Sequence, residues 1–381
     1  MLPSNPFIVN GAIPAPYFCD RKTETEQLSG HIRNGRNLVL SSARRLGKTG
    51  LIQHCFDAPE LSEGTYLFFV DILQTSSLQE FVYAMGSKIF ETLKPRSRKM
   101  LDTFVQTVRS LSAEFGYDPL SGMPTFNVSM GAIANPEYTL DEIFRYIDLA
   151  DKRCVIAIDE FQQITRYPEK NVEAVLRAHI QHCRNAAFIF AGSERHILAD
   201  MFSAYSRPFY ASSAMMNLEP LERDVYKQFV IEHFAEFGKR VDEGVPEQVY
   251  DLFAGNTYCM QRTFNVAFEH TPEGGSCTAS TIDEAVELIL QELDHSLRMR
   301  LSLLSSKPKA LLLAIAAEGI ASHLTSGAFV RKHRLASTSS VQSAVKQLLS
   351  EDWITFSGTD KDVCYSLSDK FMQLWIRKNY L

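Results

Sequence analysis

The chain has 381 residues, 45% of them hydrophobic and 22% charged, with a formal net charge of −6. This length predicts two or three domains, and the composition is that of an ordinary soluble globular protein rather than a disordered or fibrous one. A negative overall charge excludes a chain that attracts nucleic acid through its whole surface. Residues 300–381, however, carry eleven lysines and arginines against six acidic residues, which can mark a separate basic module.

The ends and the cysteines give no sign of export or membrane insertion. No signal peptide opens the chain, and its longest apolar run, Ala310–Ala317, is too short to span a bilayer. The seven cysteines are scattered without a C-x-x-C pair, so neither a disulfide framework nor a cysteine zinc site is predicted. We expect a cytoplasmic protein that makes no membrane contact.

The N-terminal segment predicts an arm followed by a helix. Four prolines precede Tyr17, which favours an extended path, and residues 22–32 have the apolar spacing of an amphipathic helix. The run F-C-D-R-K-T-E-T-E-Q-L, which begins at Phe18, spans the start of this helix.

Residues 37–52 predict a strand, a loop and a helix that together bind phosphate. The loop S-A-R-R-L-G-K-T follows the pattern G-x-x-x-x-G-K-[ST], with Ser42 in the place of the first glycine. In such a loop Gly47 permits close approach of the backbone to the phosphates, Lys48 contacts the β- and γ-oxygens, and the Thr49 hydroxyl reaches Mg²⁺. The predicted nucleotide-binding residues here are Arg45, Leu46, Gly47, Lys48, Thr49 and Gly50.

The next predicted elements are a strand, an insertion and a second buried strand. Residues 65–73 are almost continuously apolar, as a doubly covered parallel strand should be. The insertion, about residues 74–140, shows helical spacing over 78–93 and 100–115, and its stretch 124–133 alternates like a hairpin. A helix over 140–150 leads to the apolar strand 153–160.

That strand ends in two carboxylates, Asp159 and Glu160, where active sites of parallel sheets lie. We predict that Asp159 holds Mg²⁺ and that Glu160 polarises the attacking water. A solvated acidic turn is the simpler alternative, but the phosphate loop upstream argues against it.

These motifs resemble those of STAND and AAA+ ATPases, and the chain is similar over nearly its whole length to a bacterial branch of the archaeal-type ATP-binding proteins. The branch-specific similarity lies in the runs D-E-F-Q-Q-I, from Asp159, and R-P-F-Y, from Arg207. In these families the box around Phe18 and Arg21 lies beside the adenine. Here Asp20 replaces the box's glycine, which is a departure from the family's pattern at a point that sets the backbone path.

The resemblance also implies roles for three residues beyond the phosphate loop. Ser193, which follows the predicted strand 186–192, takes the sensor 1 position; capping the next helix is the alternative. Arg207 lies where AAA+ proteins place a trans-acting arginine finger; an intramolecular ion pair is the alternative. Arg262 is a candidate sensor 2, or else a solvated arginine.

The C-terminal third predicts two further helical regions. Residues 222–298 repeat apolar residues at helical spacing and resemble the lid of AAA+ proteins. Residues 307–317, 327–334 and 341–350 predict three helices, and 353–357 and 363–367 two short strands, which together indicate a winged helix. A basic cluster, residues 331–334, precedes its third helix.

We therefore expect a three-layer α/β P-loop NTPase core over residues 1–220, a helical lid over 221–300 and a winged helix over 301–381. The expected function is hydrolysis of ATP with Mg²⁺, at a slow rate, as a nucleotide-driven conformational switch. One alternative is a DNA-associated AAA+ ATPase of the origin-binding or transposition-helper kind. Another is a nucleotide-binding interaction protein without significant hydrolysis, against which the set Lys48, Asp159 and Glu160 argues. A homo-oligomer or an unidentified protein partner is compatible with each.

Overall fold

A computed structural model describes residues 4–93, 114–117, 124–127, 133–358 and 363–381. The chain divides into two compact units, one of residues 12–219 and one that joins the N-terminal residues up to Gly11 to residues 220–381. The first unit is an α/β core and the second is mostly helical. The N-terminal arm therefore belongs to the helical unit, whereas the sequence analysis placed it with the core.

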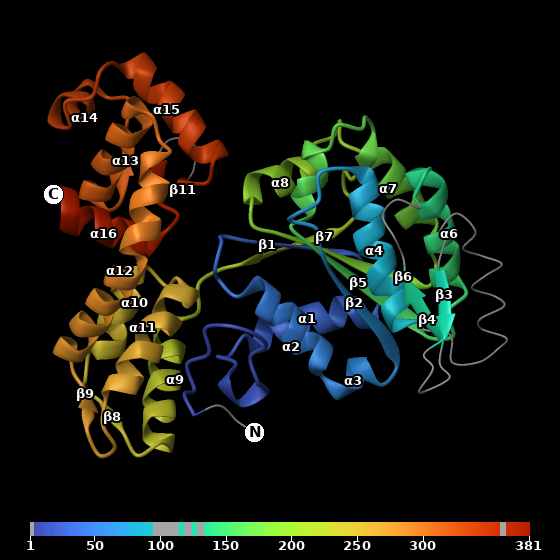
Figure 1. Cartoon of the computed structure of the whole chain (residues 1–381), viewed down its shortest axis with the longest axis horizontal. Helices are drawn as coiled ribbons and strands as arrows, with labels where there is room; N and C mark the ends of the chain where they lie inside the picture. Colours follow the sequence, from blue (N-terminus) through green and yellow to red (C-terminus); the bar gives the residue numbers. More distant parts are fainter. Residues whose placement is uncertain (1–3, 94–113, 118–123, 128–132, 359–362) are drawn as a thin grey trace. The chain divides into compact units, whose positions relative to one another are not determined.

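The core is built on one parallel five-stranded sheet (Figure 1). Every neighbouring pair of strands runs in the same direction. The central strands are buried along nearly their whole length because helices cover both faces, which explains their continuous apolar sequence. In order across the sheet, the strands are β2 (Thr65–Asp71), β5 (Arg153–Asp159), β6 (Ala186–Gly192), β1 (Leu38–Ser42) and β7 (Ala214–Leu218).

Two hydrophobic clusters, one on each face of the sheet, make the core a three-layer sandwich. Successive residues of β1 point to opposite clusters: Leu38 and Leu40 pack into one and Val39 into the other. The first cluster receives α1 (Lys22–Arg33), α2 (Lys48–Asp57) and α3 (Pro59–Ser62). The second receives α4 (Leu78–Thr92), α6 (Pro136–Asp148), α7 (Val172–His182) and α8 (Arg195–Ser203). The predicted α/β/α architecture is confirmed.

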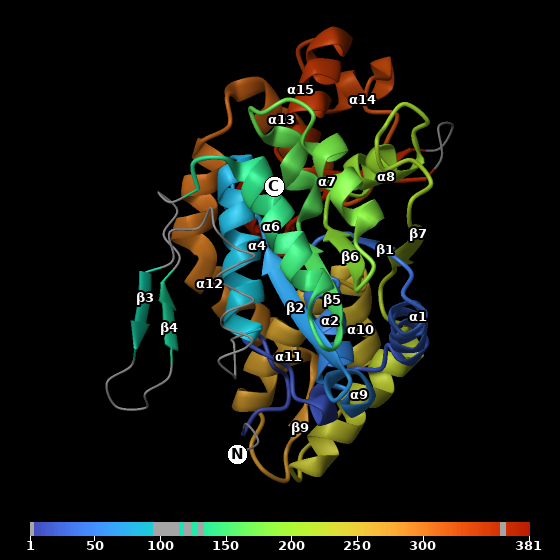
Figure 2. The same cartoon turned by 90° about the vertical axis from the view of Figure 1, so that its right-hand side faces the viewer.

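The insertion between β2 and β5 differs from its prediction. Helix α4 is confirmed, but most of the second predicted helix, residues 100–115, lies outside the described residues. Its end is a strand: β3 (Glu114–Tyr117) pairs antiparallel with β4 (Pro124–Asn127), and Figure 2 shows this pair apart from the five-stranded sheet. Of the predicted hairpin over 124–133, residues 124–127 form β4, whose partner is the upstream strand β3, and residues 128–132 lie outside the described residues. The aromatic alternation of Phe115 and Tyr117 favours strand over helix there.

The first part of the second unit is a group of four helices: α9 (Arg223–Glu236), α10 (Val245–Phe253), α11 (Thr257–His270) and α12 (Ala279–Ser302). The sequence predicted this helical region but not the short parallel pair β8 (Arg240–Val241) and β9 (Ser276–Cys277). The described part of the N-terminal arm packs into these helices. Phe7 is fully buried among aromatic rings of α9 and α11, namely Phe229, Phe234, Phe264 and Phe268.

The C-terminal part is a winged helix. Its three predicted helices are α13 (Ser306–Glu318), α14 (Gly327–Lys332) and α15 (Thr338–Ser350), and the side chains of Ser326 and Ser337 cap the last two. Its sheet has the order β10 (Ala321–Ser322), β12 (Cys364–Leu367) and β11 (Ile354–Ser357). Strand β10 and the terminal helix α16 (Lys370–Tyr380) were not predicted. Within the described residues, no helix has the length and apolarity needed to cross a membrane.

Candidate nucleotide site

The phosphate loop connects the end of β1 to the start of α2. Gly47 takes the left-handed conformation with φ 91° immediately before the helix, and Arg45 does so at φ 65°. Ser42 keeps a negative φ as the last residue of β1, so this position does not require the glycine of the motif. No side chain caps the start of α2. The amides and the positive end of the helix are thus left to an anionic ligand.

Lys48 and Thr49 meet two carboxylates at the carboxyl end of the sheet. The Lys48 ammonium donates hydrogen bonds to Asp159 Oδ1 and, at 3.1 Å, to Glu160 Oε1. The Thr49 hydroxyl donates to Asp159 Oδ2 at 2.8 Å. Lys48 is 6% exposed and Asp159 5%, so these charges are held out of water and compensate one another. The two motifs, more than a hundred residues apart in the chain, come together as predicted.

Glu160 lies at the centre of a network of donors. Its backbone is left-handed, with φ 56°, and its Oε2 accepts hydrogen bonds from Gln162 Nε2 at 2.6 Å and Ser193 Oγ at 2.8 Å. Burial raises the pKa of this carboxyl, but the Lys48 charge and the hydrogen bonds of Gln162 and Ser193 outweigh it and hold the pKa below its usual range. Glu160 is therefore ionised at neutral pH.

Ser193 does not cap the following helix. Helix α8 begins at Arg195 with Glu194 at its N-cap position and no side-chain cap hydrogen bond, so this alternative was wrong. Because Ser193 directly follows β6, which lies between β1 and β5, its hydroxyl reaches the carboxylate at the end of β5.

The Arg21 side chain contacts the backbone of the phosphate loop. Its buried guanidinium donates to the carbonyl oxygens of Leu46, at 3.1 Å, and Glu219, at 2.7 Å, and to the Glu24 carboxylate. Asp20, in the place of the family's glycine, has a φ of 46°, so the left-handed path that a glycine would permit is adopted by an aspartate. The family resemblance places Arg21 beside the adenine, and these hydrogen bonds hold its guanidinium against the carbonyl oxygens of Leu46 and Glu219.

Phe18 stacks on a helix that carries the phosphate loop. Its ring centroid lies 4.1 Å from that of His54 with the rings 10° from parallel. One edge of the ring also faces Gly50, where an added Cβ would lie 3.6 Å from it. Burial lowers the pKa of His54, so this imidazole is neutral at pH 7.

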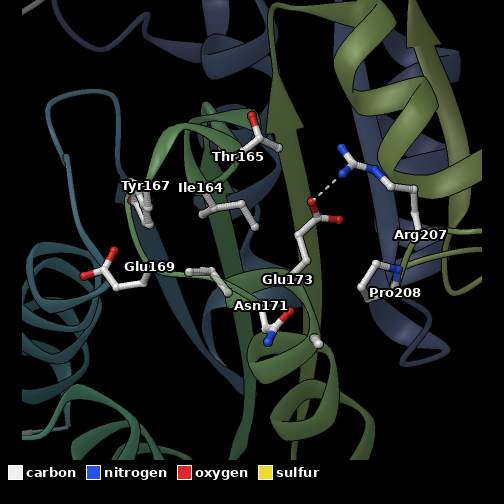
Figure 3. A pocket seen from close by; sticks show the side chains of 10 residues that line it. Ile164, Thr165, Tyr167, Glu169, Asn171, Glu173, Arg207 and Pro208 are labelled. Carbon is white, nitrogen blue, oxygen red and sulfur yellow. Dashed lines mark ion pairs between the residues drawn. The ribbon is translucent and has the colours of Figure 1, made fainter.

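Arg207 lies away from this cluster, beside a pocket of about 270 Å³ (Figure 3). Its guanidinium is 3.0 Å from Glu173 Oε1 and 3.0 Å from Asp200 Oδ2. Burial raises the pKa of Glu173, and the Arg207 charge opposes that rise. The structure thus shows the intramolecular ion pair that was one of the two predicted roles.

Arg262 belongs to the helical unit, on α11. It contacts the Glu292 carboxylate at 2.8 Å and the Tyr258 hydroxyl at 3.2 Å, and its guanidinium lies over the Phe371 ring. It is therefore not the solvated arginine of the simpler alternative. Its sensor 2 role stays a prediction.

The sequence analysis missed three participants. Gln162 contacts Glu160 directly, and beyond it Arg166 donates to both carboxylate oxygens of Glu194, at 2.7 and 2.8 Å. The polar residues that follow Asp159 were the only sign of these contacts in the sequence. Which way their side chains point depends on the 3-10 helix Phe161–Arg166.

Solved structures share this architecture. The Walker-type ATPase PABY2304 of Pyrococcus abyssi superposes with a TM-score of 0.67 at 16% identity, over 98% of this chain and 99% of that one. The Aeropyrum pernix ORC2 protein, in ADPNP and ADP complexes, gives 0.55 at 14% identity, over 98% and 97%. The ORC1 protein of the same organism, in complex with DNA, gives 0.53 at 12% identity, over 99% and 97%. At these identities the likeness concerns the fold.

Comparison with protein families shows which family the chain belongs to. No protein with a curated description matches it. Residues 296–378 match the family described as a probable winged helix domain. Residues 18–262, well over half of the chain, match the family described as an ATPase domain predominantly from Archaea. The chain therefore belongs to this archaeal-type ATPase family and carries a winged helix domain at its C-terminal end.

Proposed function

We propose that this protein binds ATP with Mg²⁺ and hydrolyses it as a nucleotide-driven conformational switch of the STAND/AAA+ kind. The observation that carries the proposal is the buried cluster of Lys48, Thr49, Asp159 and Glu160 at the uncapped start of α2. A lysine, a hydroxyl and two carboxylates in this arrangement supply a phosphate contact, metal ligands and a group that can orient water.

The residues at this edge of the sheet fit a nucleoside triphosphate and a hard divalent cation. Beside Gly47 the space is open, since a Cβ built there would meet no atom within 4 Å. The loop from Arg45 to Gly50 would cradle the phosphates with its backbone amides. Thr49 and Asp159 offer the oxygen ligands that Mg²⁺ prefers, and the bound cation would neutralise phosphate charge.

The same geometry supports hydrolysis. Glu160 is ionised and can accept a proton from, or orient, an attacking water. In the structure, however, both of its carboxylate oxygens are engaged, Oε1 by Lys48 and Oε2 by Gln162 and Ser193. With nucleotide bound, Lys48 would exchange carboxylate for phosphate, which would free Glu160 Oε1 to face an attacking water. We assign Ser193 to the positioning of Glu160.

Three residues receive narrower proposals. Phe18 would contact the adenine with the face or edge that His54 leaves open, and Arg21 would act on the nucleotide only through the phosphate loop. Arg262 would serve as sensor 2 by exchanging Glu292 for phosphate. An Arg262→Ala variant with unchanged affinity and turnover would contradict that role.

Replacement of Glu160 by glutamine tests the proposal. We expect Glu160→Gln to bind ATP and Mg²⁺ as tightly as the wild type but to lose about 10²- to 10⁴-fold in kcat, because the amide cannot accept a proton. The measurements are phosphate release and titration with a fluorescent nucleotide. Glu60→Gln, at an exposed position of α3, is the matched control and should retain full activity. Wild-type turnover by Glu160→Gln would remove Glu160 from the mechanism.

For Arg207 we favour the intramolecular role, because two carboxylates already neutralise its charge. The expected result is an ATPase rate per chain that does not change with protein concentration. A rate that rises with concentration, and that Arg207→Ala flattens without loss of nucleotide affinity, would instead place this guanidinium across a subunit interface.

A second candidate is a DNA-associated ATPase. The observation in its favour is the exposure of Arg331 and Arg334 on the winged helix, neither of which forms an ion pair with a described residue. The Aeropyrum pernix ORC1 protein, which shares the fold, was solved in complex with DNA. Lys332 and His333 contribute less, since both contact Glu318.

A further inference from the structure

The Gln162 side chain, 1% exposed, lies between two carboxylates of the core. Its amide nitrogen donates to Glu160 Oε2 at 2.6 Å and lies 3.5 Å from Glu194 Oε1. No role for this residue follows from the phosphate-loop or carboxylate motifs. A primary amide can donate two hydrogen bonds from one atom, so it suits a position between two acceptors.

The orientation of this amide is fixed by charge. If the carboxamide were rotated by 180°, its oxygen would face two carboxylates, and every contact would become a repulsion between acceptors. In the orientation observed, Gln162 Oε1 is buried and has no hydrogen-bond partner among the described residues. An unpaired buried acceptor is costly, so the fold gives up stability to keep the donors on Glu160.

The surrounding backbone is built to hold the side chain there. Gln162 lies in a 3-10 helix that begins directly after Glu160, whose left-handed conformation turns the chain back toward β6. On β6, a Cβ added to Gly192 would lie 2.1 Å from Gln162 Oε1, so only a glycine leaves room for the carboxamide. The position is therefore set from both sides.

We propose that Gln162 is a positioning residue for hydrolysis, one that anchors Glu160 Oε2 so that Oε1, once released by Lys48, faces the attacking water. The inference rests on the ATPase function proposed above and adds a residue to it. Gln162 acts only through Glu160 and need not touch nucleotide. Ser193 anchors the same oxygen from β6, so the two donors share the task.

Charged groups from three elements surround Glu160. Lys48 contacts it from α2, Asp159 precedes it on β5, and Glu194, paired with Arg166, lies across the Gln162 amide. Loss of the Gln162 donor leaves these charged neighbours in place and removes a hydrogen bond that fixes the orientation of the Glu160 carboxylate.

The experiment compares Gln162→Met with Gln163→Met in the full-length chain. Methionine keeps the length of the side chain and removes the donor. Gln163 is the matched control, because it lies in the same 3-10 helix but donates to the Thr75 carbonyl, at 2.9 Å, rather than to Glu160. The measurements are kcat and KM for ATP with Mg²⁺, nucleotide affinity, and the midpoint of thermal unfolding, each also in the Glu160→Gln background.

For Gln162→Met we expect kcat to fall about ten- to a hundredfold, part of what general base catalysis contributes, with nucleotide affinity within about threefold of wild type. Gln163→Met should match the wild type. In the Glu160→Gln background, Gln162→Met should cost little further turnover, because it acts only through Glu160. Equal kcat in Gln162→Met and Gln163→Met would overturn the inference. So would a parallel loss of affinity, turnover and thermal stability in Gln162→Met.

A wild type that binds ATP without turning it over would contradict the proposed function, and unfolding then decides on Gln162. If it anchors the Glu160 carboxylate, Gln162→Met must lower the melting temperature less in the Glu160→Gln background than in the wild type. An equal loss in the two backgrounds would assign Gln162 to packing alone.

Discussion

Lys48 has two roles, nucleotide binding and stabilisation of the fold, and the sequence motif indicates only the first. As the cation of a phosphate loop it is expected to bind nucleotide, but in the structure it also neutralises two carboxylates that are largely shielded from water. Removal of one member of a buried ion pair leaves an uncompensated charge, which costs far more than loss of an exposed pair. Binding and stability are therefore coupled at this residue.

We expect Lys48→Ala to lose most of its ATP affinity and about 3–5 kcal/mol of unfolding free energy at neutral pH. The Lys48 charge lowers the pKa of Glu160, so its stabilising effect is present while Glu160 is ionised and is lost as pH falls through that pKa. The deficit of the variant should therefore shrink in acid. Urea unfolding at pH 7 and near pH 4, followed by circular dichroism, measures it.

A deficit of equal size at both pH values would show that Lys48 stabilises the fold through packing rather than charge. Lys48→Arg, which keeps the charge, serves as the control and should retain more stability than Lys48→Ala at neutral pH.

Residues that a motif or a family position specifies were predictable, whereas Gln162, and the contact of Arg21 with the phosphate loop, were not. The spacing of Gly47, Lys48 and Thr49, together with two carboxylates at a strand end, is sufficient to identify the centre of the site. Gln162 and Arg21 reach it only because a left-handed residue turns the local chain, at Glu160 and at Arg21 itself. No period or spacing in a single sequence signals such a turn when the residue is not glycine.

At the scale of elements, the N-terminal arm is a part of the helical unit rather than a loose extension. Asn5 donates to the carbonyl of Asn265 at 2.9 Å, and Asn265 donates to the carbonyl of Phe7 at 2.7 Å. These reciprocal hydrogen bonds hold an extended segment across α11 and place Phe7 among four aromatic rings. One short segment thus completes a core made by elements over 200 residues away.

We expect Phe7→Ala to lower the unfolding free energy of the helical unit by about 3–5 kcal/mol, since it empties a fully buried aromatic position. Both tryptophans, Trp353 and Trp375, belong to this unit, so tryptophan fluorescence during urea unfolding reports on it selectively. Val9→Ala, at a half-buried position of the same arm, is the control and should cost no more than about 1 kcal/mol. Equal effects of the two changes would contradict the anchoring role.

Elements with a strong period or continuous burial were predicted to within a few residues, as with β5, β6 and α15. Strand β10 was missed because a strand of two residues has no sequence period and depends on the strand it pairs with. Strand β10 has two residues and exists through its partner β12. Helix α16 carries a cap at Asp369 and buries Phe371, Trp375 and Ile376, a spacing typical of an amphipathic helix.

For the whole molecule, the distribution of charge limits how its basic C-terminal module can contact DNA, since the net charge is −6. Lys332 and His333 both contact Glu318, whereas the exposed Arg331 and Arg334 form no ion pair with a described residue. On α15 the exposed side chains include Gln342, Ser343 and Lys346, which suit contacts with phosphate better than the reading of guanine. Any DNA binding should therefore be weak, tolerant of sequence and sensitive to salt.

Titration of the full-length chain with mixed-sequence DNA between 50 and 200 mM salt tests this expectation, with fluorescence anisotropy as the readout. Each phosphate contact releases about one counterion, so Arg331→Ala with Arg334→Ala should weaken binding for all sequences and make the slope of log K against log salt shallower by about 2. The control pair, Lys22→Ala with Arg240→Ala, removes the same charge from exposed positions outside the winged helix and should leave the slope unchanged. Equal losses of affinity in both double variants would show that binding depends on overall charge rather than on the winged helix. Absence of binding at 50 mM salt would favour a role of the winged helix in the nucleotide switch over a role in DNA binding.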